Sequence, residues 1–151
     1  VDRHDVDDAQ ALRFRIATRP IGDSVDLKVV RRGRARALRF DLIAPPEDPP
    51  RNLILIEGRN PFAGITAGNL SPALSEEIGI DAAQDGVIVV GIERRSTAAR
   101  LGFHAHDIIR AVNGETIDRV SDLRRTTREE QARWLVEIER EGRIIQFQVS
   151  G

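Results

Sequence analysis

The sequence predicts an α+β chain that holds one complete copy and one half copy of the same small, β-rich module. Three observations lead to this prediction. Two stretches read alike when aligned at an offset of about 110 positions, the length of one small domain. Both contain short runs in which every second side chain is apolar, the pattern of a half-buried strand. A proline-rich run separates the half copy from the rest of the chain.

The repeated part reads in both copies as strand, turn, short helix, strand, turn and strand. Residues 25–29 and 134–138 alternate apolar with other side chains, which predicts one strand in each copy. Gly33 and Gly142 follow these strands and supply the residue that tolerates the positive φ of a hairpin turn. The segments after these turns are predicted to return as antiparallel partners.

The proline-rich run marks the predicted domain boundary. Two Pro-Pro pairs fix φ and remove hydrogen-bond donors, which predicts a stiff, extended linker over residues 44–51. Residues 1–43 are then only the second half of a module, because the strands and loop expected in residues 53–110 have no counterpart before them. Residues 52–151 are predicted to form the complete module.

The complete module is predicted to alternate short strands with short helices. Gly79 and Gly102 are expected to end its first two helices, because glycine readily adopts the left-handed conformation of a helix end. The predicted order is a strand at 53–58, a loop at 60–65, a short strand at 66–71, a helical turn at 72–80, a buried strand at 86–92, a short helix at 96–102 and a strand from 106 that runs into a turn at 113–114.

The composition excludes several classes of function. The 23 basic and 24 acidic residues leave a net charge of −1, which gives no bulk attraction to nucleic acid or to an anionic membrane surface. The absence of cysteine excludes disulfides, thiolate metal sites and cysteine nucleophiles. No apolar run approaches the roughly 18 residues of a membrane span. Because the sequence has no methionine, we expect Val1 not to be a natural start and the chain to be an excised or processed piece.

Four motifs in the complete module resemble, in their order, the signature of a bacterial PDZ domain. They are Gly-Val-Ile-Val at 86–89, Ser-Thr-Ala-Ala-Arg-Leu-Gly at 96–102, Asp-Ile-Ile at 107–109 and Val-Asn-Gly at 112–114. The segment Asn-Pro-Phe-Ala-Gly-Ile at 60–65 is similar to the second PDZ domain of Do-like members of the Deg/HtrA serine proteases. Residues 12–18 resemble the end of the preceding PDZ domain, so the resemblance covers almost the whole chain.

The resemblance implies a fold, a location and a set of partners. The implied fold is a circularly permuted PDZ domain, a partly open barrel or sandwich of about five to six strands capped by two short helices, preceded by half of another PDZ module. The implied parent is a periplasmic serine endopeptidase whose PDZ domains hold unfolded substrates and control oligomer assembly. Expected partners are peptides or unfolded protein segments and other subunits of the parent. No cofactor, nucleic acid or direct membrane insertion is expected.

The catalytic machinery of such a protease is not expected in this chain. A serine triad needs its nucleophile beside a base and an oxyanion hole, and the family's Gly-Asn-Ser-Gly-Gly segment is missing. His104 and His106 are interpreted as solvated or capping residues rather than a metal pair, because no carboxylate cluster with ligand spacing accompanies them. No catalytic residue and no metal ligand is therefore predicted. The six serines, none in a glycine-rich turn, are Ser24, Ser71, Ser75, Ser96, Ser121 and Ser150.

The binding groove implied by the resemblance begins at residues 62–65, the position of the carboxylate-binding loop. Gly64 and Ala63 would let backbone N–H groups approach a terminal carboxylate, whereas Phe62 would line the pocket for the last side chain. The strand from Ile65 to Leu70 is predicted as the open sheet edge to which an extended peptide adds. An ordinary inter-strand connection is the alternative interpretation of the loop.

The other wall of the implied groove is a helix predicted from Ser121, its N-cap, to about Glu129. Asp8 is predicted to cap the corresponding helix of the half copy. Helical spacing puts three residues of this wall toward the groove, of which Arg124 would contact an acidic residue or a carbonyl of the ligand. The candidate peptide-binding residues are Phe62, Ala63, Gly64, Ile65, Thr66, Ala67, Val120, Arg124 and Thr127.

Three functions are compatible with this sequence. The leading interpretation is a non-catalytic, peptide-binding regulatory segment of a Do-like protease. The second is an assembly module that contacts neighbouring subunits and binds no peptide. The third is a PDZ segment of another protease type, such as a carboxyl-terminal processing or intramembrane protease. The tandem arrangement and the Asn-Pro-Phe segment count against the third.

Overall fold

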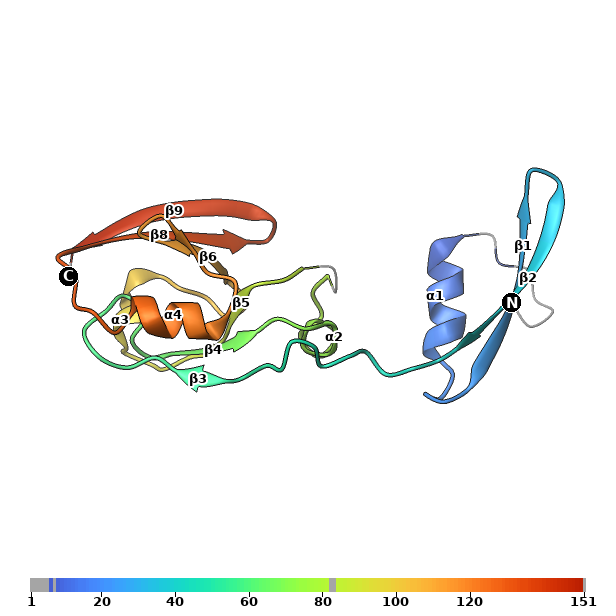
Figure 1. Cartoon of the computed structure of the whole chain (residues 1–151), viewed down its shortest axis with the longest axis horizontal. Helices are drawn as coiled ribbons and strands as arrows, with labels where there is room; N and C mark the ends of the chain where they lie inside the picture. Colours follow the sequence, from blue (N-terminus) through green and yellow to red (C-terminus); the bar gives the residue numbers. More distant parts are fainter. Residues whose placement is uncertain (1–5, 7, 82–83, 151) are drawn as a thin grey trace. The chain divides into compact units, whose positions relative to one another are not determined.

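The computed structural model describes residues 6, 8–81 and 84–150, and it divides into two compact units, Val1–Pro45 and Pro46–Gly151. The division falls within the residues predicted as a linker. Figure 1 shows the helices and strands of each unit. None of the helices in the described residues has the length and apolar character needed to cross a membrane.

The N-terminal unit is a helix followed by a two-stranded antiparallel hairpin (Figure 1). The helix α1, Ala9–Ala17, begins at Asp8, whose carboxylate accepts a hydrogen bond from the N–H of Ala11 at 2.7 Å, as the sequence predicted. The strands are β1, Ser24–Arg31, and β2, Arg34–Asp41. Of the described core residues of the chain, this unit contributes only Val25.

The C-terminal unit is built on a seven-stranded antiparallel sheet whose order is β3-β4-β5-β6-β8-β9, with β7 paired to β6. The sheet ends at β3 and β9 without closing into a barrel. The strands are β3, Ile54–Leu55, β4, Ile65–Asn69, β5, Val87–Ile92, β6, Ile108–Val112, β7, Glu115–Thr116, β8, Arg133–Arg140, and β9, Arg143–Ser150.

Three short helices accompany this sheet: α2, Pro72–Ile78, α3, Thr97–Leu101, and α4, Val120–Thr126. Ser71 and Ser96 cap α2 and α3 through hydrogen bonds from the N–H groups of Leu74 and Ala99. Gly79 and Gly102 end these helices in the left-handed conformation that the sequence predicted, with φ of +75° and +84°.

The core of the C-terminal unit lies between the sheet and its helices. Its centre is the aromatic contact of Phe62 with Trp134, whose rings meet edge to face at 6.5 Å between centroids, and of Phe62 with Phe103 at 5.5 Å. Trp134 is fully buried. A second, smaller cluster contains Leu74 and Ile88 and packs α2 against the sheet.

The predicted fold class is confirmed as an α+β arrangement of open sheets, with corrections at three places. The resemblance implied about five to six strands and two short helices, whereas the described C-terminal unit has seven strands and three helices. Two of the strands are only two residues long, and α2 is a complete helix rather than a single turn. The predicted first strand at 53–58 shortens to β3. Helix α4 begins after Arg119 rather than at Ser121 and ends at Thr126.

Candidate functional site

The backbone of the predicted carboxylate-binding loop is hydrogen-bonded within the chain. The N–H of Phe62 donates to the side-chain oxygen of Asn60 at 3.0 Å, and the N–H of Ala63 donates to the Asn60 carbonyl at 3.3 Å. The N–H of Ile65 donates to the carbonyl of Phe62 at 2.9 Å, and that of Gly64 to the carbonyl of Ile56 at 2.8 Å. The four amides of the loop therefore already have acceptors within the chain, so none of them is free to bind a terminal carboxylate in this conformation.

Gly64 packs against the start of α3. Its φ is +93°, a conformation that other residues rarely adopt, and a Cβ placed on it would lie 2.2 Å from the Cβ of Ser96. Its carbonyl accepts a hydrogen bond from the N–H of Glu93 at 2.8 Å. The sequence interpretation, in which this glycine makes room for a ligand, missed the neighbour that the structure places there.

Strand β4 is paired along both of its edges, which corrects the prediction of an open edge from Ile65 to Leu70. One edge pairs with β5, with a register shift between Thr66 and Ala67. The other edge pairs antiparallel with β3, so that Ile54 lies opposite Ala67 and Leu55 opposite Thr66. Figure 1 shows β3 running alongside β4. The edge expected to receive a peptide thus carries a strand of the same chain.

Residues 51–56, which we call the strap, continue this pairing beyond β3. At one end the N–H of Ile56 donates to the carbonyl of Ile65 at 2.8 Å. At the other end the carbonyl of Arg51 accepts a hydrogen bond from the N–H of Asn69 at 2.7 Å. The strap therefore covers β4 from its first residue to its last.

Arg51 fixes the start of the strap through two carboxylates. Its guanidinium donates to both oxygens of Glu47, at 2.6 and 2.9 Å, and to Glu77 of α2 at 3.0 Å. The hydrogen bond from Arg51 lowers the pKa of Glu47, and the two carboxylates raise the pKa of Arg51. Because these groups are solvent-exposed, we expect each pair to hold the strap only weakly.

Asn69 joins the strap, β4 and α4, a role that the sequence reasoning missed. Its buried side chain accepts a hydrogen bond from the N–H of Val120 at 2.8 Å and donates one to the carbonyl of Pro50 at 2.8 Å. An asparagine at the end of an apolar strand, directly before a helix-capping pattern, was the available signal. Its two hydrogen-bond partners are distant in the sequence, so no local sequence pattern indicated them.

The predicted helical wall is only partly accessible. Val120 is buried in the core, Arg124 is exposed and Thr127 is half-buried. The hydroxyl of Thr127 donates to the carbonyl of Leu123 at 2.8 Å. Of the loop and strand candidates, Phe62, Gly64, Ile65 and Ala67 are buried, whereas Ala63 and Thr66 are half-buried.

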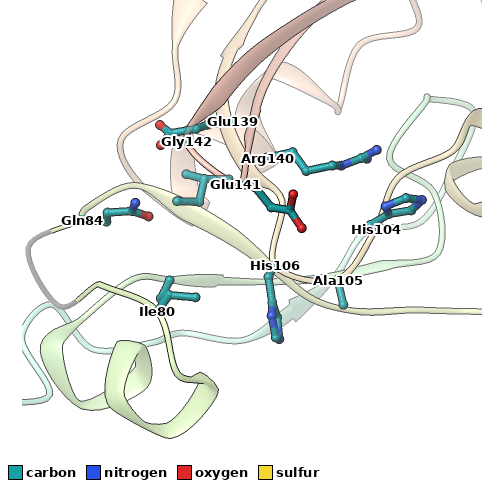
Figure 2. Close-up of a pocket in the computed structure, with 10 residues that line it drawn as sticks. Ile80, Gln84, His104, Ala105, His106, Glu139, Arg140, Glu141 and Gly142 are labelled. Carbon is teal, nitrogen blue, oxygen red and sulfur yellow. The ribbon is translucent and has the colours of Figure 1, made fainter.

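The cavity shown in Figure 2, of about 370 Å³, lies elsewhere in the C-terminal unit and contains none of the predicted site residues. It is lined in part by His104, His106 and Arg140. Arg140 donates to both oxygens of the buried Asp107, at 2.6 and 2.7 Å, and the N–H of His104 donates to the same carboxylate at 2.8 Å. These groups hold the β8–β9 end of the sheet in place. Within residues 6, 8–81 and 84–150, no group of three or more potential metal ligands occurs.

The fold resembles that of HtrA-type protease segments. A structure of the HtrA-type protease AlgW with a decapeptide superposes with a TM-score of 0.51 at 21% identity, over 58% of this chain and 27% of that one. The HtrA3 PDZ domain bound to a phage-derived ligand gives a TM-score of 0.48 at 23% identity, over 66% of this chain and 84% of that one. No protein-family model matches the sequence.

Sequence relatives point to the same proteases. The chain is 26% identical over 144 residues to a probable periplasmic serine endoprotease DegP-like of Chlamydia pneumoniae, covering 95% of this chain and 28% of that protein. It is 24% identical over 115 residues to the periplasmic serine endoprotease DegP of Salmonella typhimurium, covering 76% of this chain and 21% of that protein. The chain is thus similar to one part of HtrA-type serine proteases, and it spans about a quarter of the length of these relatives.

Proposed function

We propose that this chain is a non-catalytic, peptide-binding regulatory segment of a Do-like periplasmic serine endopeptidase. In this proposal the C-terminal unit captures extended segments of unfolded proteins, or C-termini, by adding them as a strand to β4. The relatives are named as periplasmic serine endoproteases, and the chain matches only about a quarter of their length. The AlgW structure was solved with a decapeptide, which supports a peptide as the ligand class.

The observation that carries this proposal is the antiparallel pairing of β3 with β4. Strand addition needs a sheet edge whose N–H and C=O groups accept an extended partner in register. The outer edge of β4 has this property, because the strap pairs with it from Arg51 to Ile56. The edge is thus shaped for a strand, whichever chain supplies it.

The proposed roles of the candidate residues follow from their positions. Thr66 and Ala67 supply main-chain pairing, and the loop ending at Gly64 receives the end of the ligand strand nearest to it. Arg124 is exposed on α4 and would attract an acidic ligand residue. The remaining candidates, Phe62, Ala63, Ile65, Val120 and Thr127, would shape the walls.

A titration with matched peptides tests the proposal. Peptides with free C-termini and the same peptides with amidated C-termini would be titrated against the whole chain and followed by calorimetry. Binding of both forms indicates strand addition by internal segments, whereas binding of the free form alone indicates carboxylate capture. Absence of binding throughout would contradict the proposal.

The second candidate, an assembly module that binds no peptide, is favoured by one observation. The amides of residues 62–65 and the outer edge of β4 are all engaged within the chain, while β9 forms the other end of the sheet and exposes Ile144. Light scattering over a range of concentrations distinguishes the two. A defined oligomer that dissociates on Ile144→Asp, together with absent peptide binding, would favour assembly.

A further inference from the structure

We propose that the strap, residues 51–56, is an intramolecular ligand of the β4 edge, and that an external peptide binds by displacing it. This inference rests on the proposed function, since it concerns the same edge. It adds the regulation of that edge and the class of peptide that the edge accepts.

The strap occupies β4 in the way that an added peptide strand would. Its pairing is antiparallel, and its side chains alternate between the core and solvent. Ile54 and Ile56 pack into the main core, whereas Leu53 and Leu55 are 48% and 44% exposed. An extended peptide with aliphatic residues at alternate positions presents the same face.

The attachments of the strap are weak compared with those of β8 and β9 at the other end of the sheet. Only two residues form regular strand structure, against eight in β8 and eight in β9. Its start is fixed by the exposed ion pairs of Arg51. Its other end leads into the exposed residues 57–59, where Gly58 has a φ of +96°. The strap can therefore leave β4 while the strands behind it stay paired.

The geometry at Gly64 indicates which part of a peptide the edge receives. The N–H of Gly64 donates to the backbone carbonyl of Ile56, and the chain continues from there through Glu57. A peptide in this position needs a backbone carbonyl oxygen as the acceptor for the Gly64 N–H, and it does not need a terminal carboxylate. The preferred ligand is thus an internal, extended segment with aliphatic residues at the positions of Ile54 and Ile56.

A reversible disulfide tests this inference in the whole chain. Leu55 and Thr66 are directly opposite each other on adjacent antiparallel strands, a spacing that suits a disulfide, and the protein has no cysteine of its own. The probe is an acetylated, amidated and fluorescent peptide with the sequence of residues 51–58. In the variant Leu55→Cys/Thr66→Cys, we expect oxidation to weaken probe binding at least about tenfold and reduction to restore it, because the tethered strap competes at high effective concentration.

Two further chains complete the experiment. Arg51→Ala loosens the strap and should bind the probe about twofold to fivefold more tightly than the unmodified chain. The control disulfide Leu135→Cys/Gln148→Cys joins the exposed partners of β8 and β9, so its oxidation should leave probe binding unchanged. Far-UV circular dichroism establishes that each variant is folded. A probe with asparagine in place of both isoleucines should not bind.

The outcomes separate this inference from the proposed function. Equal probe binding by the oxidised and reduced strap variant would overturn the intramolecular-ligand inference. It would mean that the probe adds to another edge of the sheet. Absence of probe binding by every chain, including reduced Leu55→Cys/Thr66→Cys and Arg51→Ala, would also overturn this inference, whereas the proposed function is overturned only if the peptides with free C-termini fail to bind as well.

Discussion

The two units of this protein share a sequence pattern, but the apolar side chains of that pattern are mostly buried in the C-terminal unit and mostly exposed in the N-terminal unit. In both, a short helix precedes a hairpin: α1, β1 and β2 in the N-terminal unit, and α4, β8 and β9 in the C-terminal unit. Trp134, Val136 and Ile138 of β8 are all but fully buried, whereas β1 has Val25 alone in the core. The difference follows from pairing, because β8 also pairs with β6, while β1 pairs with β2 alone in the described residues. Alternation thus predicts a strand, and the neighbouring strands decide whether its apolar face is covered.

The largest expected effect comes from truncating equivalent residues of β8 and β1. Ile138→Ala should lower the free energy of unfolding of the C-terminal unit by about 2–5 kcal/mol, because it leaves a cavity in a closed core. Val29→Ala, at the matching position of β1, should change stability by less than about 0.5 kcal/mol, because this side chain is exposed. Urea unfolding followed by circular dichroism measures both changes, and Trp134 fluorescence follows the C-terminal unit alone. Equal costs would mean that β1 has a buried face in solution.

Two glycines with positive φ sharpen the same contrast. Gly64→Ala should cost about 2–4 kcal/mol, because backbone strain adds to the overlap with Ser96. Gly33→Ala, in the β1–β2 turn, should cost only about 1 kcal/mol, because nothing lies within 4 Å of the position that its Cβ would take and strain acts alone. Thermal unfolding of the two variants provides the comparison. A cost at Gly64 no larger than at Gly33 would contradict the close approach to Ser96.

A third comparison concerns the arginines that end β8 and β1. Asp107→Ala should destabilise the C-terminal unit by about 1–3 kcal/mol, since it removes the acceptor of Arg140 and of the His104 N–H. Arg31→Ala, at the position of β1 that corresponds to Arg140, should stay within about 0.5 kcal/mol, because Arg31 is exposed. Urea midpoints measure both changes. If Asp107→Ala proves neutral, the ion pair contributes nothing to the β8–β9 end.

The smallest effect concerns the pH dependence of the strap. Because Arg51 lowers the pKa of Glu47, the attraction between them is complete above the ordinary carboxyl pKa and is lost as the pH falls through the lowered value. An NMR titration should give a lower pKa for Glu47 in the unmodified chain than in Arg51→Ala. Equal values in both chains would show that the ion pair is absent in solution.

The sequence predicted the repeated elements of this fold well and the pairing of β4 poorly. The alternation in residues 134–138 and the helix-ending glycines Gly79 and Gly102 are local signals, and the structure confirms them. The start of α4 was misplaced, because the carboxylate of Asp122 accepts a hydrogen bond from the N–H of Arg119, which competes with a cap at Ser121.

The candidate site was harder to predict, because its essential contacts join distant segments. Residues 53–58 were recognised as a strand, but no local pattern indicates which strand they pair with. Asn69 bonds to partners 19 and 51 positions away, Pro50 and Val120. Whether the nine candidate residues bind a peptide stays a prediction, which the titration and the disulfide experiment test.

The covalent continuity of linker and strap has a mechanical consequence. The proline-rich residues before Arg51 lead directly into the strap, so tension along the linker reaches β4 first at the Arg51 end. A pull there loads the ion pairs of Glu47 and Glu77 and the hydrogen bond between Asn69 and Pro50 before it reaches Ile56. Force transmitted along the chain would thus separate the strap from β4 progressively, from the exposed Arg51 end toward the buried Ile56 end. The remaining strands of the sheet would experience the force last.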